Sequence, residues 1–304
     1  MKQIPLFIIN GMLDSGKTTF IQTIIHQDGF YKKGTTLLIT LEEGEVEYDS
    51  IKLMDDFNTT VLALDDDTLL PKEKLENLIK MHRFDRVIIE NNAMSEKVLD
   101  LPECLIVSQI ITLIDCETFE SYYQNMRVKM ADIIRPANLI LFNRIDGKED
   151  KLLSYKRSLM LLNADADYVF QNSNGEVIDT LADELPYDLN SDVIKIEDKD
   201  YGVFFIDSYD QKERYENKKV NLNCVCYMQA DGIVVVGRLA MTCCENDIQL
   251  LGFFTDIKEM FKANEWINLT AIVKYETIED EEEPVLKVVS YEKIKQIKDP
   301  VVTL

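Results

Sequence analysis

The chain has 304 residues, 46% of them hydrophobic, so its length suffices for one large globular domain or for two ordinary ones. Its 33 basic and 55 acidic side chains give a net charge of −22, which argues against nucleic acid and anionic membranes as partners and serves either solubility or an affinity for metal cations. No apolar run approaches the 18 residues that span a bilayer, and the apolar start leads into a turn instead of a signal-peptide cleavage site, so we expect a cytoplasmic protein that is not itself transmembrane.

The first predicted strand, residues 4–9, ends in the segment GMLDSGKT of residues 11–18, which matches the pattern G-x-x-x-x-G-K-[ST] at every fixed position. Gly11 and Gly16 allow the backbone to curl so that its N–H groups face an anion, and the helix that begins near Lys17 adds its positive end. Lys17 is placed to reach the outer phosphates, and the Thr18 hydroxyl is placed to bind Mg²⁺. An ordinary glycine-rich turn is the alternative, but the strand before and the helix after this segment favour a nucleotide-binding loop.

Strands and helices then alternate as far as residue 171. We predict strands at 34–40, 59–64, 85–90, 108–114, 137–142 and 167–171, and helices at 71–82, 117–130 and 151–162. This alternation predicts an α/β fold of the P-loop NTPase type, with a mainly parallel sheet flanked by helices, in which ligands bind beyond the carboxyl ends of the strands. Polar segments fall at those ends: the phosphate loop, the acidic loop 42–49, Glu90 and residues 143–146.

The segment Asn143-Arg144-Ile145-Asp146 follows an apolar strand and indicates recognition of a guanine base. The Asp146 carboxylate is suited to accept hydrogen bonds from the N1–H and the exocyclic amine of guanine, which adenine does not offer, and a carboxylate left without these bonds penalises the wrong base. Asn143 is suited to brace the loop or to meet the N7 atom of the ring, and the flat Arg144 side chain to lie over the base.

Taken in order, the segments GMLDSGKTT, EEGEVEYD, DRVIIENNAM, ITLIDCETF and ANLILFNRID resemble the CobW-type family of P-loop GTPases, relatives of the GTPases that insert nickel into hydrogenase and urease. The resemblance covers about residues 1–185 and implies Mg²⁺-dependent GTP hydrolysis, often with delivery of a metal to a client metalloprotein. It also implies a homodimer as one arrangement, because relatives often dimerise around the nucleotide.

The resemblance also implies roles for individual residues. It implies phosphate contacts by the loop and the start of the helix: Asp14, Ser15, Gly16, Lys17, Thr18 and Thr19. The switch acid of the family falls on Glu42, with Glu45 and Asp49 also matching, and the Walker-B-like acid falls on Glu90. Lys17, Glu42 and Glu90 are therefore the expected catalytic residues, Thr18 and Glu90 the expected Mg²⁺ ligands, and Asn143, Arg144 and Asp146 the expected base contacts.

The sequence departs from the family at several of these motifs. The family usually carries a Cys-x-Cys-Cys metal motif, but residues 50–85 contain no cysteine. Ala93 replaces a glycine after the Walker-B-like acid, Arg144 replaces a lysine, and Leu41 replaces an asparagine. We expect nucleotide binding to survive and hydrolysis to be slow. The carboxylates of residues 42–49 and 65–67 offer oxygen ligands for Mg²⁺, Mn²⁺ or Ca²⁺, or form a solvated acidic surface.

The second half of the chain changes in pattern. Residues 1–185 are the predicted GTPase domain, and the polar, acidic residues 186–217 predict a connecting segment. Strands without intervening long helices follow at 220–228, 233–241, 248–255, 266–275 and 285–291, which predicts a small β-rich domain of the OB kind over residues 218–304.

This second domain carries Cys224, Cys226, Cys243 and Cys244. Their thiolates would suit Zn²⁺ or another transition metal, whereas buried free thiols serve as small hydrophobes. The pattern R-x-x-M-T-C-C-x-x-D-x-Q of residues 238–249 resembles the C-terminal region of the YcgQ-type bacterial proteins, which are encoded with permeases, and implies a transporter component as a partner. Two functions stay open: a GTP hydrolase of the metallochaperone type, and a nucleotide-gated interaction module with little turnover that is tied to a membrane transporter.

Overall fold

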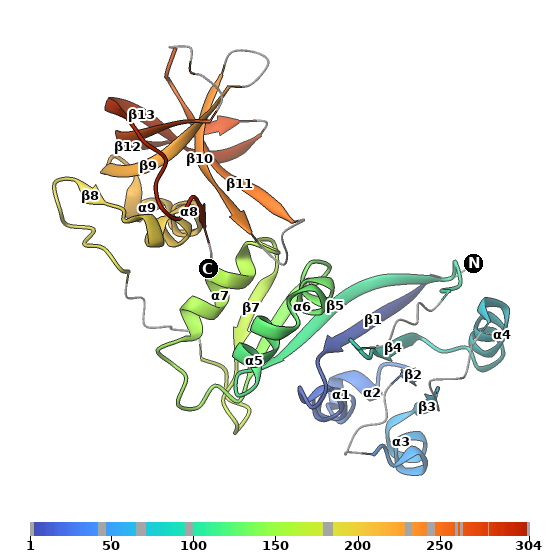
Figure 1. Ribbon diagram of the computed structural model, residues 1–304. Helices are drawn as coiled ribbons and strands as arrows, with labels where there is room; N and C mark the ends of the chain where they lie inside the picture. Colours follow the sequence, from blue (N-terminus) through green and yellow to red (C-terminus); the bar gives the residue numbers. More distant parts are fainter. Residues whose placement is uncertain are drawn as a thin grey trace. The chain divides into compact units, whose positions relative to one another are not determined.

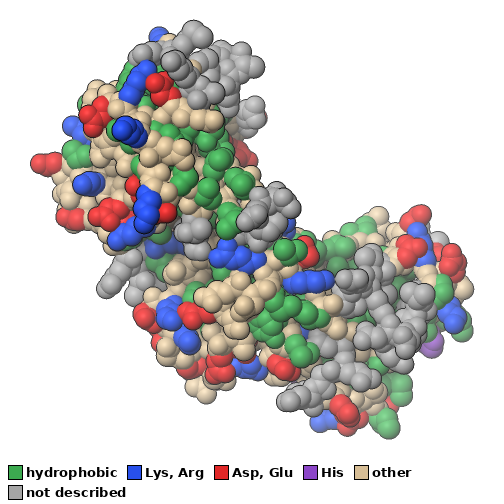
Figure 2. All heavy atoms as spheres, in the orientation of Figure 1, with side chains coloured by type: hydrophobic (Ala, Val, Ile, Leu, Met, Phe, Trp, Pro, Cys, Tyr) green, Lys and Arg blue, Asp and Glu red, His purple; other side chains and the backbone are tan. Residues whose placement is uncertain are grey.

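The computed structural model divides the chain into two compact units, Met1–Ala182 and Asp183–Leu304 (Figure 1). It describes residues 3–41, 47–64, 71–94, 100–178, 185–228, 233–241, 247–258, 261, 264–278 and 280–302. Acidic, basic and apolar side chains share the face of each unit that Figure 2 shows. None of the helices in the described part of the chain is both long and apolar enough to cross a membrane.

The described residues of the first unit form one parallel sheet in the order β3-β2-β4-β1-β5-β6-β7. Its strands are β1 (Ile4–Gly11), β2 (Thr36–Thr40), β3 (Thr59–Ala63), β4 (Arg86–Glu90), β5 (Leu105–Asp115), β6 (Leu139–Asn143) and β7 (Asp167–Phe170). The helices are α1 (Lys17–Ile25), α2 (Asp28–Tyr31), α3 (Ser50–Phe57), α4 (Lys72–His82), α5 (Phe119–Asn125), α6 (Arg127–Ile134) and α7 (Leu152–Met160). The prediction of a P-loop NTPase fold is confirmed.

Alternating strand residues bury the two faces of this sheet, as the period of two requires. Leu38 and Ile88 pack with Ile21 of α1 and Leu53 of α3 on one face. Their strand neighbours Leu37, Ile39, Val87 and Ile89 pack on the other face, with Leu75 and Ile79 of α4. Apolar side chains of α5, α6 and α7 form a further cluster with Ile140 and Phe142 of β6.

Three helical stretches of the first unit differ from the sequence-based expectation, and the first of them, α2, was not predicted. The helix predicted over residues 117–130 is instead the pair α5 and α6, because Met126 between them leaves the helical region with φ −133° and ψ 39°. Helix α3 was not predicted, although the Asp49 side chain caps it by accepting a hydrogen bond from the Lys52 N–H at 3.0 Å. The left-handed Asn58 follows the last residue of α3.

In the second unit, strands β9 (Lys219–Met228), β10 (Val234–Met241), β11 (Ile248–Thr255), β12 (Glu265–Ile278) and β13 (Glu281–Ile294) close into a ring in the order β9-β10-β11-β13-β12. All of their pairings are antiparallel except β11 with β13, which is parallel. Short strands β8 (Ile194–Lys195) and β14 (Val301–Val302) extend β9 and β10. This closed ring is the β-rich barrel that the strand spacing predicts.

The expected connecting segment, residues 186–217, contains β8, the 3-10 turn η1 (Asp198–Asp200), α8 (Tyr201–Asp210) and α9 (Lys212–Tyr215). Helix α8 packs on the barrel: the Phe204 and Phe253 rings lie 5.4 Å apart, and the Tyr201 hydroxyl donates to the Leu251 carbonyl at 2.9 Å. The segment therefore belongs to the second unit. Its overall composition is polar, but its aromatic residues bury apolar surface against the barrel.

Gly237 of β10 faces Gly252 of β11, and a Cβ at Gly237 would lie 2.4 Å from the Leu251 carbonyl oxygen. We expect Gly237→Ala to lower the free energy of unfolding of the second unit by about 1–3 kcal/mol, because backbone must move to admit the methyl group. Denaturant unfolding followed by the fluorescence of Trp266, the one tryptophan of the chain, reports on this unit. Ser290→Ala, at an exposed site of β13, is the control and should change this energy by less than about 0.5 kcal/mol. Equal free energies of unfolding for Gly237→Ala and Ser290→Ala would show that β10 and β11 do not approach each other this closely at Gly237.

Candidate functional site

The loop between β1 and α1 is tightly curled, and its backbone enters the left-handed region. Asp14 and Gly16 have φ values of 57° and 87°. A Cβ at Gly11 would lie 2.2 Å from the Ser15 Oγ, and a Cβ at Gly16 would lie 2.9 Å from the Asn143 Nδ2. Gly11 therefore allows the tight curl of the loop, and Gly16 allows the loop to approach Asn143 at the end of β6.

Lys17 is the first residue of α1, and its side chain is only 3% exposed. The Lys17 ammonium donates to the carbonyl oxygens of Gly11 and Met12 at 3.2 and 2.9 Å. These contacts fold the side chain back along the loop, so its positive charge lies beside the N-terminus of α1. A helix N-terminus and a buried ammonium together favour an anion at this end of the sheet.

Glu90 ends β4 and brings a carboxylate to the start of α1, because β4 pairs directly with β1 and places Glu90 opposite Ile9. The Thr18 hydroxyl donates to Glu90 Oε1 at 2.7 Å, and the Tyr48 hydroxyl donates to Glu90 Oε2 at 2.8 Å. Glu90 is 3% exposed. A hydroxyl and a carboxylate side by side are the hard oxygen donors that Mg²⁺ prefers, so Thr18 and Glu90 fit this ion.

Asn143 and Arg144, at the end of β6, are tied to the phosphate-loop backbone. The Asn143 Nδ2 donates to the Ser15 carbonyl at 2.7 Å, which is the bracing role considered from the sequence. Arg144, with φ 50°, donates from Nη1 to the Asp14 carbonyl at 3.2 Å and to Asp115 Oδ2 at 2.5 Å. Arg144 thus connects the loop to the end of β5.

Asp146 is exposed, and the loop after β7 fixes its orientation. Asp146 Oδ2 accepts hydrogen bonds from the Ser173 hydroxyl at 2.6 Å and from the Ser173 N–H at 2.8 Å. These two bonds, the hydroxyl first, lower the pKa of the Asp146 carboxyl, so the group keeps its negative charge to lower pH.

A cavity of about 580 Å³ connects the phosphate loop to the loop after β7. Side chains and backbone from α1, the end of β6 and residues 171–175 line it, among them Gly16, Thr19, Phe20, Thr23, Asn143, Arg144 and Ser173. One buried polar atom of a residue that lines it, Asn143 Oδ1, has no hydrogen-bond partner within the described residues. An unpaired buried polar atom is costly, so its presence here is expected of a binding site.

The structure brings together most of the described residues that the sequence assigned to this site: Gly11, Asp14, Ser15, Gly16, Lys17, Thr18, Thr19, Glu90, Asn143, Arg144 and Asp146. Asp49, which matched the switch segment, caps α3 instead. Glu42 and Glu45 lie outside the described residues. Sequence reasoning missed Tyr48, Asp115 and Ser173, which contact Glu90, Arg144 and Asp146. Asp115 could have been found as the polar residue that ends an apolar strand, whereas no pattern pointed to the other two.

The proposed thiol site is only partly described. Cys224 and Cys226 are buried, 0% and 2% exposed, and burial raises the pKa of Cys226 to about 12 and that of Cys224 well above its usual value. A thiol of high pKa resists forming the thiolate that binds metal. Cys243 and Cys244 lie outside the described residues, and within those residues no group of three His, Cys, Asp or Glu side chains is placed to hold a metal ion.

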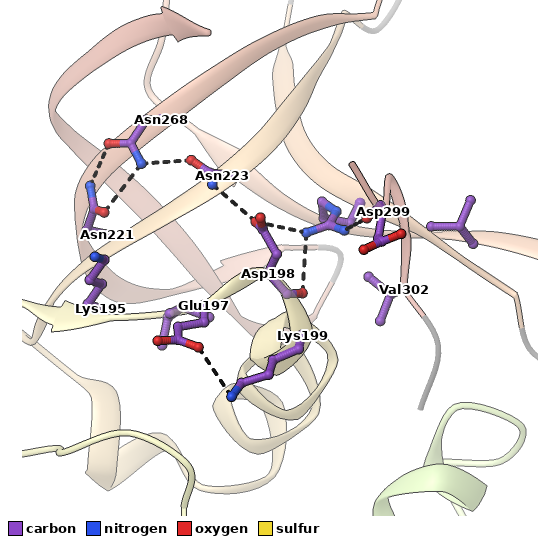
Figure 3. A pocket seen from close by; sticks show the side chains of 12 residues that line it. Lys195, Glu197, Asp198, Lys199, Asn221, Asn223, Asn268, Asp299 and Val302 are labelled. Carbon is purple, nitrogen blue, oxygen red and sulfur yellow. Dashed lines mark hydrogen bonds and ion pairs between the residues drawn. The ribbon is translucent and has the colours of Figure 1, made fainter. Parts of the chain in front are cut away.

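The second unit has a larger cavity, about 620 Å³, lined by a row of polar side chains (Figure 3). Asn221 donates to Asn268 Oδ1 at 2.8 Å, Asn268 donates to Asn223 Oδ1 at 2.8 Å, and Asn223 donates to Asp198 Oδ1 at 3.1 Å. Among the described residues that line this cavity, no buried side-chain polar atom is without a partner. The buried polar groups of this cavity are thus already hydrogen-bonded to protein and do not need a ligand. The smaller cavity beside the phosphate loop is therefore the better candidate site.

Arg238 ends this polar row and holds neighbouring segments to the barrel. It is 1% exposed, and its guanidinium lies 5.6 Å from the centre of the Tyr201 ring and 5.5 Å from that of Trp266. It donates to the carbonyl oxygens of Asp299 and Pro300 at 2.6 and 3.3 Å and pairs with Asp198 at 3.4 Å. Its role here is to fix η1 and the segment before β14.

Comparison with known proteins finds two family matches. The CobW/HypB/UreG nucleotide-binding domain matches residues 5–170, and the DUF1980 C-terminal domain matches residues 172–303. Among solved structures, the hydrogenase maturation factor HypB from Archaeoglobus fulgidus is 18% identical, with a TM-score of 0.43 over 57% of this chain and 82% of that one. The Zn(II)-bound YjiA GTPase from E. coli is also 18% identical, with a TM-score of 0.43 over 82% of this chain and 89% of that one.

We expect Arg238→Met to lower the free energy of unfolding of the second unit by about 2 kcal/mol or more, because buried carbonyl groups lose a charged donor. Denaturant unfolding followed by Trp266 fluorescence measures the loss. Lys199→Met removes another cation that lines the same cavity but is 75% exposed, and it should cost less than about 0.5 kcal/mol. An Arg238→Met protein as stable as the Lys199→Met protein would contradict the assigned role.

Proposed function

The chain belongs to the CobW/HypB/UreG nucleotide-binding family through residues 5–170, and from this premise we propose that it binds GTP with Mg²⁺ and hydrolyses the γ-phosphate. The observation that carries the proposal is the start of α1, where the buried Lys17 donates to the carbonyls of Gly11 and Met12 and the next residue, Thr18, donates to Glu90 Oε1 at 2.7 Å. A triphosphate supplies the negative charge that this ammonium and the helix N-terminus would balance.

Each residue has a distinct part in the proposed reaction. Lys17 and the loop N–H groups would bind the phosphates and offset the charge that develops on them during transfer. Thr18 and Glu90 would hold Mg²⁺, which when bound neutralises phosphate oxygens. Asp146 would accept the two guanine donors, with Ser173 holding its carboxylate in place. Glu42 stays the proposed switch acid on the strength of the sequence.

We propose that this hydrolysis serves metal handling. The proposal is supported by the family to which the first unit belongs. The segments that would carry cargo metal, around Glu42 and around Cys243 and Cys244, lie outside the described residues. The raised pKa values of Cys224 and Cys226 favour the reading of these two thiols as core residues. A client metalloprotein, a transporter component and a homodimer remain proposals of the sequence, as do a cytoplasmic location and a domain boundary at residue 185.

One observation favours the second function, a nucleotide-gated module with little turnover. Ala93, which replaces the family's glycine after Glu90, is 8% exposed and packs in the cluster formed by α5, α6 and α7. A packed alanine restricts the backbone that would respond to the γ-phosphate. Phosphate release from GTP, measured with Mg²⁺, separates the two: turnover supports the hydrolase, and tight binding without turnover supports the module.

We expect Lys17→Ala to weaken GTP binding by about 100-fold or more, because charge-assisted hydrogen bonds to the phosphates are lost. Isothermal titration calorimetry of the purified full chain with GTP and Mg²⁺ measures the dissociation constant. Lys32→Ala is the matched control, since Lys32 lies on the surface of the same unit and pairs with Asp28 at 2.6 Å. Undiminished affinity in Lys17→Ala, or an equal loss in Lys32→Ala, would overturn the proposed function.

A further inference from the structure

The Tyr48 hydroxyl donates a hydrogen bond to Glu90 Oε2 at 2.8 Å. Tyr48 lies in the segment just before α3 and is separated from Glu90 by 42 residues of sequence. Nothing in the sequence pattern or the family match gives this tyrosine a role.

The neighbours of Tyr48 in the chain, Glu47 and Asp49, are also hydrogen-bonded. The Gln22 side chain of α1 donates to the Glu47 carbonyl at 3.4 Å, and Asp49 caps α3. Tyr48 is therefore held between the helix of the phosphate loop and α3, and its hydroxyl is aimed at the carboxylate. A tyrosine placed in this way has few alternative rotamers, so its hydrogen bond fixes the carboxylate at little further cost in entropy.

The carboxylate needs such a support because glutamate is long. Glu90 has one more rotatable bond than aspartate, and its two oxygens must face the Thr18 hydroxyl and the metal together. Thr18 fixes Oε1 and Tyr48 fixes Oε2, so the pair of bonds sets the plane of the carboxylate before any ligand arrives. Groups that orient a metal ligand in this way typically contribute 10–100-fold to metal affinity.

We propose that Tyr48 is a positioning residue for Mg²⁺: its hydroxyl orients Glu90 so that the carboxylate and the Thr18 hydroxyl present one preformed pair of oxygen ligands. This inference rests on the proposed function, because the ion would bind there together with GTP. It adds to the metal site a residue to which the matching segment EEGEVEYD assigned no role. It also ties the segment 47–49 and the start of α3 to the ligand that Glu90 holds.

The test is Tyr48→Phe, which removes the hydroxyl and keeps the ring. Binding of a fluorescent, non-hydrolysable GTP analogue is measured in EDTA and across a Mg²⁺ titration. We expect the EDTA affinity to match the wild type, because the phosphate loop is intact, and the Mg²⁺ concentration for half-saturation to rise about 10–100-fold. Tyr31→Phe is the matched control, since its hydroxyl donates to the exposed Asp28 carboxylate at 3.1 Å, and it should behave as the wild type.

A double-mutant cycle with Glu90→Gln and a thermal unfolding curve without nucleotide complete the experiment. If Tyr48 acts through the Glu90 carboxylate, Tyr48→Phe has no further effect on Mg²⁺ dependence in the Glu90→Gln background, and it melts as the wild type does. An unchanged Mg²⁺ dependence in Tyr48→Phe, or an equal loss of affinity in EDTA, overturns the inference and leaves the proposed function standing. A wild-type chain that binds no guanine nucleotide overturns both.

Discussion

The hydrogen bond between the Thr18 hydroxyl and the Glu90 carboxylate, 2.7 Å long, is the contact on which the candidate site depends. It forms because β4 lies next to β1 in the sheet, in a register that places Glu90 beside Ile9. Any other strand order would leave the carboxylate away from the helix that follows the phosphate loop. Helices cover both faces of these apolar strands, and the burial of apolar surface stabilises this strand order. The polar site is thus positioned by an apolar sheet.

The opposite end of the cavity follows from the same sheet order. Strand β6 lies two places from β1, across β5, so its terminal Asn143 and Arg144 reach back to the carbonyls of Ser15 and Asp14. Strand β7 then brings Ser173 to Asp146. Parallel strands that end at one edge of the sheet therefore bring residues of the loop after β1 and of the loops after β6 and β7 to one cavity. This is the general behaviour of open α/β sheets, where ligands bind outside the carboxyl ends of the strands.

The sequence predicted the parts of this site that are contiguous. Residues 11–19 and 143–146 carry their chemistry within a few positions, and the strands around them follow from apolar periodicity. Tyr48 and Ser173 could not be predicted, because their partners Glu90 and Asp146 lie 42 and 27 residues away and meet them only in the folded sheet. The same limit applies in the second unit, where the barrel was predicted but α8 was not. Tyr201 and Phe204 lie in the short apolar run YGVFFI of residues 201–206, which also suits a strand, and that it forms a helix becomes evident only against the barrel.

The cavity beside the phosphate loop is proposed to select a guanine nucleotide. Calorimetric titration of the wild-type chain with GTP, inosine triphosphate and ATP, each with Mg²⁺, tests this proposal most directly. All three present the same triphosphate, so differences in affinity report on the base alone. We expect inosine triphosphate, which lacks the exocyclic amine, to bind about 10-fold more weakly than GTP, and ATP to bind more weakly still by a further factor of about 10 or more. ATP that binds as tightly as GTP would contradict the proposal.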